Sequence, residues 1–362
     1  MNQTVSVSPE TQTIDPQRTA WSAVVINYNG EEQILGTIAS LLATVNPPEE
    51  IIVVDDGSTD SSLDLVADAY PQAQILKLAE NTGCTSKVRN TGLFAAKQRY
   101  VLVSDNDIDF MPDSVQKMLD VMQSREDVAL CTPVVCYADN PSEVCVVAHP
   151  LHYCAWSAVR DEHNLSELIA TGPFQAIGCG IQLIDRERIA GLGGFDEKLK
   201  IAWCDDGEFH HRIHMVGLAC YSVPDAKILH KRIRVKHRRM GQIHNRLILM
   251  FKCYELRTLL VLSPALVLFE AMLAAYMLVS GNVREYFRAV GEVFSKRGAI
   301  MQDRRGLQAI RKRTDRQLLS AGVLSLPKGG RGKVSRPQAL ASSLFRVYWR
   351  LASPLLRREV AK

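Results

Sequence analysis

Short apolar runs recur along the first part of the chain, and segments with helical spacing separate them. The runs are residues 22–28, 51–54, 74–78, 100–104 and 128–133. None of them alternates apolar with polar positions, which is typical of parallel strands covered on both faces. The helical pattern is clearest at Ile34, Leu35, Ile38, Leu41 and Leu42, and it returns near residues 61–69, 85–98 and 113–123. Strands that alternate with helices predict a doubly wound, Rossmann-like α/β sheet.

Polar residues follow three of the predicted strands at the point where each strand ends. They are residues 27–30 (NYNG), 55–60 (DDGSTD) and 105–109 (DNDID). Ligands of doubly wound sheets bind at the carboxyl ends of the strands, so we expect these residues to converge on one rim. The glycine-rich fingerprint of dinucleotide enzymes and the P-loop are both absent from the sequence, which argues against a dehydrogenase and a P-loop enzyme.

Asp105 and Asp107 flank one residue directly after a predicted strand, so we expect both carboxylates to point toward one region of the rim. Carboxylate oxygens suit Mg²⁺ or Mn²⁺, and such ions keep further positions for water and phosphate oxygens. An Asp-x-Asp pair taken alone also fits a turn that caps the next helix. Its place among the other polar strand ends favours the metal site.

Six motifs in one order resemble the family 2 glycosyltransferases, which have the GT-A fold, over roughly residues 20–235. The motifs are VVINYNG, VVDDGSTD, NTG followed by VRNTGLFAA, VLVSDNDIDF, GLGGFDE and DDGEFHHR. The resemblance implies a nucleotide-sugar donor, with Arg89 near its base or phosphates and with Asp105 and Asp107 as the metal-binding element. The positions that it assigns to nucleotide-sugar binding are Asn27, Asp55, Asp56, Arg89 and Asp105.

A transferase needs a base for the acceptor hydroxyl, and a carboxylate in a partly desolvated cleft suits this task. We predict that Asp206 is this base, with Asp205 beside it in the catalytic site. Where the resemblance implies Glu-Asp-x-Asp, this chain has Asp205, Gly207 and Glu208, followed by Arg212. These departures leave a neighbour of Asp206 as an alternative base. The acidic cluster also fits the cap of a helix that the pattern starts at Glu208.

His230 matches a histidine that completes the metal site in many related enzymes. The alternative is a polar group near the core, since neutral imidazole is a poor ligand for Mg²⁺, though it suits Mn²⁺ better. His210 and His214 share one helix face, but no glutamate stands beside them in His-Glu-x-x-His order. A zinc hydrolase is therefore disfavoured.

Charge divides the chain into an acidic and a basic part. Residues 227–362 hold 29 Lys and Arg against 7 Asp and Glu, whereas residues 1–226 hold 14 against 32. An acidic part suits metal binding, and a basic part suits a polyanion or an anionic membrane. The nine cysteines are scattered without a Cys-x-x-Cys pair, as expected for reduced thiols in a cytosol.

Two segments of the basic part predict contact with a membrane. Residues 256–280 are long enough to span a bilayer and carry two charged residues, Arg257 and Glu270. Pro264 and basic residues on both flanks favour a bent or in-plane helix pair at the interface over a span. Residues 339–358 mix large apolar side chains with arginines, which is typical of an interfacial helix on anionic lipid. Packing on the catalytic domain or on a second subunit is the alternative for both segments.

The predicted organisation has four parts. They are a flexible leader at 1–19 without signal-peptide features, a GT-A catalytic domain at 20–235, a helical, apolar, membrane-associating region at 236–320, and a basic tail with an amphipathic helix at 321–362. The fold class is therefore a GT-A type doubly wound α/β sheet followed by a mostly helical basic C-terminal region.

Together these features predict an inverting glycosyltransferase that moves one sugar to an acceptor hydroxyl on a glycan or lipid-linked acceptor. We expect it in the cytoplasm, on the inner face of the cell membrane, in polysaccharide or glycolipid assembly, and similar to rhamnosyltransferases. A sugar-nucleotide nucleotidyltransferase is one alternative, but the basic glycine-rich loop after the first strand is absent. A non-enzymatic basic protein that binds nucleic acid is another, although no nucleic-acid-binding motif accompanies the basic residues, and we expect no nucleic-acid partner.

Overall fold

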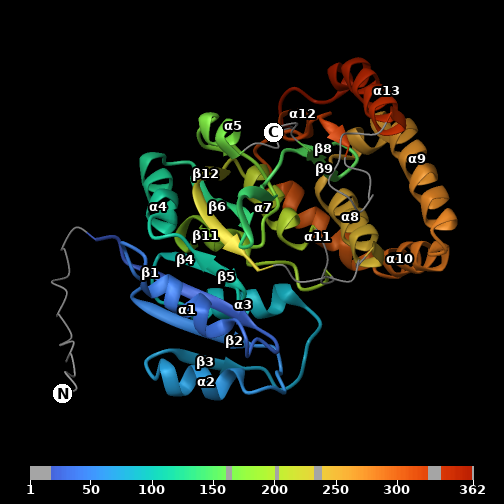
Figure 1. Ribbon diagram of the computed structural model, residues 1–362. Helices are drawn as coiled ribbons and strands as arrows, with labels where there is room; N and C mark the ends of the chain where they lie inside the picture. The colour runs from blue at the N-terminus through green and yellow to red at the C-terminus, as the bar shows by residue number, and fades with distance from the viewer. Residues whose placement is uncertain (1–17, 160–164, 200–203, 232–238, 325–335, 361–362) are drawn as a thin grey trace, which may run out of the picture.

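A computed structural model of the chain describes residues 18–159, 165–199, 204–231, 239–324 and 336–360. Residues 1–17 of the predicted leader and 325–335 of the predicted tail lie outside these ranges. The described residues form a ten-stranded sheet with helices on both faces, followed by a helical region (Figure 1). The predicted fold class, an α/β sheet with a helical C-terminal region, is confirmed.

The large sheet is mixed, and its parallel part is made by the predicted strands. Neighbouring strands follow the order β10-β12-β6-β11-β4-β1-β2-β3, while β5 pairs with β12 and β7 pairs with β6. Strands β4, β1, β2 and β3 are parallel to one another, whereas β11 runs antiparallel between β4 and β6. The strands are β1 Trp21–Asn27, β2 Glu50–Asp55, β3 Gln74–Lys77, β4 Tyr100–Asp105, β5 Ile108–Phe110, β6 Val128–Tyr137, β7 Asn140–Val146, β10 Phe174–Gln175, β11 Gln182–Asp185 and β12 Ala219–His230.

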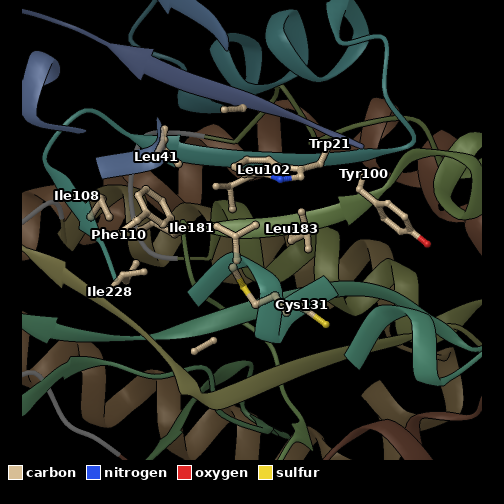
Figure 2. Packing of buried hydrophobic residues seen from close by; sticks show 14 of the residues in the cluster. Trp21, Leu41, Tyr100, Leu102, Ile108, Phe110, Cys131, Ile181, Leu183 and Ile228 are labelled. Carbon is tan, nitrogen blue, oxygen red and sulfur yellow. The ribbon is translucent and has the colours of Figure 1, made fainter. Parts of the chain in front are cut away.

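Helices cover both faces of this sheet because successive strand residues point to opposite sides. Ala23 and Val25 of β1 pack in one core with α1 and α4, which Figure 2 shows around Leu41 and Leu102, whereas Val24 packs in another core with α3 and α7. Strands β1, β2, β4 and β6 are therefore mostly apolar and buried, as their sequence indicates. The helices of this part are α1 Ile34–Leu42, α2 Ser62–Ala69, α3 Thr85–Ala95, α4 Ser114–Ser124, α5 Leu165–Ala170, α6 Arg186–Ile189 with the 3₁₀ turn Ala190–Leu192, and α7 Asp205–Met215.

The helical region has a hydrophobic core of its own. Its elements are α8 Arg239–Cys253, α9 Leu256–Val279, α10 Val283–Ser295, α11 Arg297–Ala309, α12 Asp315–Leu318 and α13 Arg336–Ala352, with the 3₁₀ turn Ser353–Leu355. A small sheet of β8 Leu151–His152, β9 Trp156–Val159 and β13 Val323–Leu324 joins this core. Tyr153 and Trp156 thus pack against the C-terminal helices, although they lie inside the range predicted as the catalytic domain.

Helix α9 is continuous, so the predicted helix pair around Pro264 is wrong. A proline removes the N–H that would bond the carbonyl of Leu260. The hydroxyl of Ser263 donates to that carbonyl at 2.8 Å and takes over this role. Of the helices that the structure describes, α9 is the one long and apolar enough to cross a membrane, and a third of its most apolar stretch is buried against the protein.

Candidate functional site

The carboxyl ends of β1, β2 and β4 lie side by side, as the sequence predicts. In the parallel register Asn27 pairs with Asp55, and Ile26 pairs with Asp105. The buried amide of Asn27 donates from Nδ2 to Oδ1 of Asp55 at 2.9 Å. Its Oδ1 accepts a hydrogen bond of 2.7 Å from Nδ2 of Asn106. One amide side chain therefore ties three strand ends together.

Gly30 makes this arrangement possible. A Cβ atom at this position would overlap the side chains of both Asn106 and Asn27. Any other residue would therefore separate the two amides and loosen the rim. The sequence places Gly30 after the first strand, but it does not show why a glycine is required there. The requirement comes from the close approach of Asn27 and Asn106, which leaves no room for a Cβ atom.

The carboxylates of Asp55 and Asp56 are buried and shape the loops that follow β2 and β3. Asp55 accepts hydrogen bonds from the N–H of Ser58 at 2.9 Å and from its hydroxyl at 2.5 Å. Oδ1 of Asp56 accepts from the N–H of Thr82 at 2.9 Å and from its hydroxyl at 2.8 Å. Both acids thus hold the rim rigid beside Asn27, and their contact with a nucleoside stays a prediction.

Arg89, from α3, lies at the centre of the candidate site between two acids. Its Nη1 is 3.2 Å from Oδ2 of Asp205, and its Nη2 is 3.9 Å from Oδ1 of Asp105. Its buried Nε has no hydrogen-bond partner among the described residues. Burial opposes its charge, but the two carboxylates raise the pKa of Arg89 overall. A fixed cation with an unused donor suits a phosphate group.

Gly180 lies directly beside this guanidinium. A Cβ atom there would stand 3.0 Å from Nη2 of Arg89 and 3.8 Å from Oδ2 of Asp105. The glycine therefore keeps the space between the two side chains open.

His230, at the end of β12, contacts Asp107 because β5 pairs with the end of that strand. Nε2 of His230 is 3.1 Å from Oδ2 of Asp107. This hydrogen bond, aided by Cys145, raises the pKa of His230 to about 10, so the ring carries a proton at neutral pH. The other oxygen of Asp107, Oδ1, is buried and has no hydrogen-bond partner among the described residues.

These acids fit a divalent ion that is held mainly through phosphate and water. Among the described residues, no three His, Cys, Asp or Glu side chains are grouped so as to hold a metal ion. The side chain of Asp105 is 38% exposed. Its partial burial raises its pKa, although the positive charge of Arg89 acts in the opposite direction. Together with the free oxygen of Asp107, it offers two carboxylates to a cation. His230 lies within hydrogen-bond distance of Asp107, and its role as a third metal ligand stays a prediction.

Helix α7 begins at Asp205, so the predicted start at Glu208 is wrong by one helical turn. Asp205 and Asp206 lie in its first turn and are each 8% exposed. Burial raises the pKa of Asp205 to about 7; the positive charge of Arg89 lowers this pKa, and the negative charge of Asp206 raises it further. Burial also raises the pKa of Asp206. Carboxyl groups with such pKa values suit proton transfer near neutral pH.

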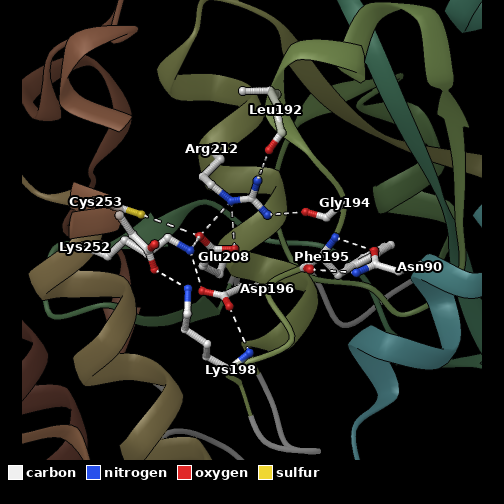
Figure 3. A network of polar contacts seen from close by, with 11 residues as sticks. Asn90, Leu192, Gly194, Phe195, Asp196, Lys198, Glu208, Arg212, Lys252 and Cys253 are labelled. Atoms are coloured by element: carbon white, nitrogen blue, oxygen red, sulfur yellow. Dashed lines mark hydrogen bonds and ion pairs between the residues drawn. The ribbon is translucent and has the colours of Figure 1, made fainter. Parts of the chain in front are cut away.

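Glu208 faces away from this rim and belongs to a buried ion-pair network. Arg212 donates from Nε to both of its oxygens, at 2.8 and 3.0 Å. Nζ of Lys252, from α8, lies 2.7 Å from Glu208 and 2.6 Å from Asp196 (Figure 3). Arg212 also donates to the carbonyls of Leu192 and Gly194. The network therefore fixes α7 to the loop before it and to the helical region.

We expect Glu208→Gln to unfold at a lower denaturant concentration than the native chain. The change leaves Arg212 and Lys252 buried without their shared carboxylate, which costs about 3–5 kcal/mol when one partner of a buried pair is removed. Urea unfolding followed by circular dichroism measures this loss. Asp113→Asn breaks the exposed pair with Lys117, which is 2.7 Å long, and should change stability by about 1 kcal/mol or less. Equal stability of the two variants would show that the network is dispensable.

His210 and His214 serve the packing of α7. Nδ1 of His210 accepts from the N–H of Gly178 at 3.0 Å, and its Nε2 lies 2.8 Å from Oε1 of Gln182. Nε2 of His214 lies 3.4 Å from the carbonyl oxygen of Ala176. Burial lowers the pKa of both rings, to about 3 for His210 and about 4 for His214. Both are neutral side chains whose ring nitrogens contact other groups of the protein.

The structure brings most of the predicted site residues to one rim. Arg89 joins Asp105 to Asp205, and Asp206 follows Asp205 in the same helical turn. Sequence reasoning missed Asn106, whose amide bonds Asn27. It lies between the two acids of the Asp-x-Asp pair, and that position was the one available signal. It also missed the split between Asp206 on the rim and Glu208 in the ion-pair network.

The family model for "Glycosyl transferase family 2" matches residues 22–162. Among curated proteins, TuaG of Bacillus subtilis, a glycosyltransferase named for teichuronic acid biosynthesis, is 33% identical over 107 residues, which cover 29% of this chain and 42% of TuaG. The succinoglycan biosynthesis protein ExoO of Rhizobium meliloti is 36% identical over 98 residues, which cover 27% of this chain and 28% of ExoO. This chain thus spans less than half the length of these two relatives.

A longer and weaker likeness extends past the matched domain. The N-acetylglucosaminyl-diphospho-decaprenol L-rhamnosyltransferase of Mycobacterium tuberculosis is 21% identical over 231 residues, covering 57% of this chain and 74% of that protein. Among solved structures, GalNAc-T7 with UDP, GalNAc and Mn²⁺ aligns with a TM-score of 0.53 and 16% identity, covering 67% of this chain and 49% of the other. That identity is low, so the likeness bears on the fold alone.

Proposed function

We propose that this chain, whose residues 22–162 match the model of the family 2 glycosyltransferases, transfers one sugar from a nucleoside-diphosphate sugar to an acceptor hydroxyl with inversion. The observation that carries the proposal is the position of Arg89 between Asp105 on the strand ends and Asp205 on α7, at 3.9 and 3.2 Å. This position supports a diphosphate site next to a carboxylate pair suited to proton transfer.

The donor occupies the rim formed by β1, β2 and β4 in this proposal. Asn27, Asp55 and Asp56 hold the nucleoside side, where their hydrogen bonds already fix the loops. Arg89 supplies the positive charge for the diphosphate. Asp105 and Asp107 would hold Mg²⁺ or Mn²⁺, which would supply positive charge against the negative charge that develops on the leaving phosphate.

Asp206 receives the acceptor proton as the hydroxyl oxygen attacks the anomeric carbon. The bond from that carbon to the diphosphate breaks at the same time, and direct displacement inverts the configuration. Asp205 is held by Arg89 at 3.2 Å, whereas Oδ1 of Asp206 accepts a hydrogen bond of 2.7 Å from the N–H of Gly207. This difference in partners supports Asp206 as the base.

A thermal-shift panel tests the donor assignment. The full chain is melted with Mn²⁺ and each of several nucleoside diphosphates and nucleotide sugars. A cognate ligand at about 100 times its dissociation constant stabilises the folded state by about 2.7 kcal/mol. We expect one nucleotide class to raise the melting temperature in a metal-dependent manner. A panel without any such shift would contradict the proposal.

The proposed acceptor is a glycan or a lipid-linked sugar, and the proposed location is the cytoplasmic face of a membrane. Exposed apolar residues line α9 and α13, two helices that pack on each other at one edge of the molecule (Figure 1). On α13, Leu344, Val347 and Leu351 are exposed, and Arg346 and Arg350 lie beside them. Apolar and basic side chains on one exposed helix support binding to anionic lipid.

Part of the sequence argument for α13 needs correction. The large apolar side chains of residues 339–358 were predicted at the lipid as one group, but Phe345 is 1% exposed, and Tyr348 and Trp349 are half-buried. The hydroxyl of Tyr348 donates to the carbonyl of Val261 at 2.7 Å, and Trp349 stacks on Tyr153 with ring centroids 5.2 Å apart. The aromatic side chains attach α13 to the protein and leave the leucines for the membrane.

We expect the double variant Leu344→Gln, Leu351→Gln to lose most of its binding to anionic liposomes. The two side chains are 54% and 72% exposed, so their replacement removes apolar contact with lipid and leaves the protein core intact. Flotation with vesicles containing phosphatidylglycerol measures the effect. In a separate experiment on membranes, release of the native chain by high salt or carbonate fits interfacial binding, whereas resistance to both fits a span. Unchanged flotation of the variant would show that α13 does not contact the lipid.

A further inference from the structure

A cavity of about 380 Å³ lies in the helical region between α8, α9, α10 and α11. Its walls include Leu247, Val293 and Ile300, which are buried. An engineered apolar cavity of roughly 150 Å³ stays dry and binds benzene, and ligand pockets measure roughly 300–1,000 Å³. This space is therefore large enough for a hydrocarbon chain and is lined to exclude water.

The cavity opens at the surface between apolar side chains and one cation. Phe251, Phe294 and Met301 line it and are 38%, 66% and 41% exposed. Arg297 also lines it, with its guanidinium 4.5 Å from the centre of the Phe294 ring and its Nη1 donating to the carbonyl of Phe294 at 3.1 Å. An apolar hole with an exposed arginine at its mouth suits a chain that ends in an anionic group.

The one acid in the cavity lining is compensated inside the protein. Glu270 forms an ion pair with the buried Arg246 and accepts a hydrogen bond of 3.0 Å from the hydroxyl of Tyr286. The acid is therefore bound from two sides and does not repel an anionic ligand strongly. This leaves Arg297 to set the charge preference at the mouth.

Two walls of the cavity also hold the segment that leads to the candidate active site. Lys252 follows Phe251 on α8 and pairs with Asp196 at 2.6 Å. Asp303 lies two residues after Met301 on α11 and pairs with Lys198 at 2.7 Å. Asp196 and Lys198 belong to the loop that precedes α7, where Asp205 and Asp206 begin the helix. The helices that form the mouth of the cavity, α8 and α11, thus also contact the segment that precedes the acidic pair.

We propose that this cavity binds the hydrocarbon chain of a lipid-phosphate acceptor, with the phosphate at Arg297. The inference rests on the proposed transfer reaction and adds the class of acceptor to it. A chain seated here anchors the acceptor in the protein while its sugar end extends to the rim. The position beside the apolar edge of α9 and α10 gives the chain a route from the lipid phase.

The test uses the full chain in solution and alkyl phosphates as defined probes, below their micelle concentrations. Calorimetric titration should show one site, with affinity that rises about fourfold for each added methylene from octyl to dodecyl phosphate. Inorganic phosphate should not bind measurably. Val290→Phe fills the cavity from its half-buried wall and should weaken dodecyl phosphate at least tenfold. Arg297→Gln should weaken it several-fold and remove the preference over dodecyl phosphocholine.

Arg288→Gln is the matched control, since Arg288 lies on α10, is 73% exposed at its side chain and pairs with Glu292 outside the cavity. Equal losses in Arg288→Gln and Arg297→Gln would reveal adsorption to a charged surface and overturn the inference. Unchanged binding in Val290→Phe would do the same. Phosphatidylglycerol that displaces dodecyl phosphate at equal affinity would assign the cavity to bulk membrane lipid instead.

Donor binding, measured on the same variants by the nucleotide thermal shift, separates this inference from the proposed function. Val290→Phe and Arg297→Gln should keep the native donor shift, which also shows that they fold. Lost alkyl-phosphate binding with an intact donor shift supports the lipid site. A native chain that shifts with donor but binds no alkyl phosphate would retain the transferase proposal and refute the cavity assignment.

Discussion

Asp206→Asn is expected to keep donor binding nearly intact and to lower sugar transfer by about 10²- to 10⁴-fold, the usual loss when a general base is removed. The amide keeps the shape of the side chain and the hydrogen bond from the N–H of Gly207, but it cannot take a proton. Single-turnover transfer with saturating donor measures the loss, and the nucleotide thermal shift shows that the donor site remains.

Asp205→Asn is the matched comparison, because it changes the neighbouring acid in the same helical turn. It removes the partner of Arg89, whose Nη1 lies 3.2 Å away, so it should weaken donor binding more and slow transfer less than Asp206→Asn. A greater loss of transfer in Asp205→Asn, or near-normal turnover in Asp206→Asn, would assign the base to a neighbour.

The pH profile of the native chain gives a second check on the acidic pair. Burial raises the pKa of Asp205 to about 7 and also raises the pKa of Asp206. A base must be unprotonated, so transfer should already fall at a pH above the range near 4 in which an ordinary aspartate takes up its proton. Asp205→Asn removes a neighbouring negative charge and the closer of the two carboxylate partners of Arg89, so the acid limb should move to lower pH. If the acid limb of the pH profile stays where it is in Asp205→Asn, Asp205 does not affect the titration of the base.

Asp107→Ala is expected to abolish the effect of Mn²⁺ on donor binding while the chain still folds. The variant removes the buried Oδ1 that lacks a hydrogen-bond partner, and the remaining Asp105 carboxylate cannot orient an ion against the diphosphate alone. Asp105→Ala should have the same effect and should also remove the longer of the two ion pairs of Arg89. Titration of the donor with and without Mn²⁺ measures the change.

Asp109→Ala is the control for this prediction, since Asp109 lies in the same segment and is paired at 3.8 Å with Lys231. It should leave the metal dependence of donor binding unchanged. Donor affinity and metal dependence that stay native in both Asp105→Ala and Asp107→Ala would show that the two acids do not form the metal site.

The sequence by itself determined the fold class and the edge of the sheet where the candidate site lies. Buried parallel strands need apolar residues on both faces, so β1, β2 and β4 are visible as unbroken apolar runs. Parallel strands share a direction, so the polar residues that end them must meet at one edge. Those two facts are local, and they were sufficient to place Asn27, Asp55 and Asp105 beside one another.

The tertiary structure alone decided which acid does what. Asp206 and Glu208 are two residues apart, but helical geometry turns Glu208 to Arg212 and Lys252, whereas Asp205 of the same turn meets Arg89 of α3. Lys252 lies 44 positions after Glu208 in the sequence, and no local pattern links them. Contacts between distant segments depend on how helices pack, and the pattern of one segment does not contain that information.

The same limit applies to the surface of the helical region. Sequence composition identified α13 as apolar and basic, yet packing sends Phe345 into the core and leaves Leu344 exposed. The two residues are adjacent in the sequence. Phe345 is buried because its face of α13 packs against α9 and Tyr153, whereas Leu344 lies on the exposed face. The apolar cavity has the same origin, since its walls come from four helices whose side chains do not completely fill the space between them.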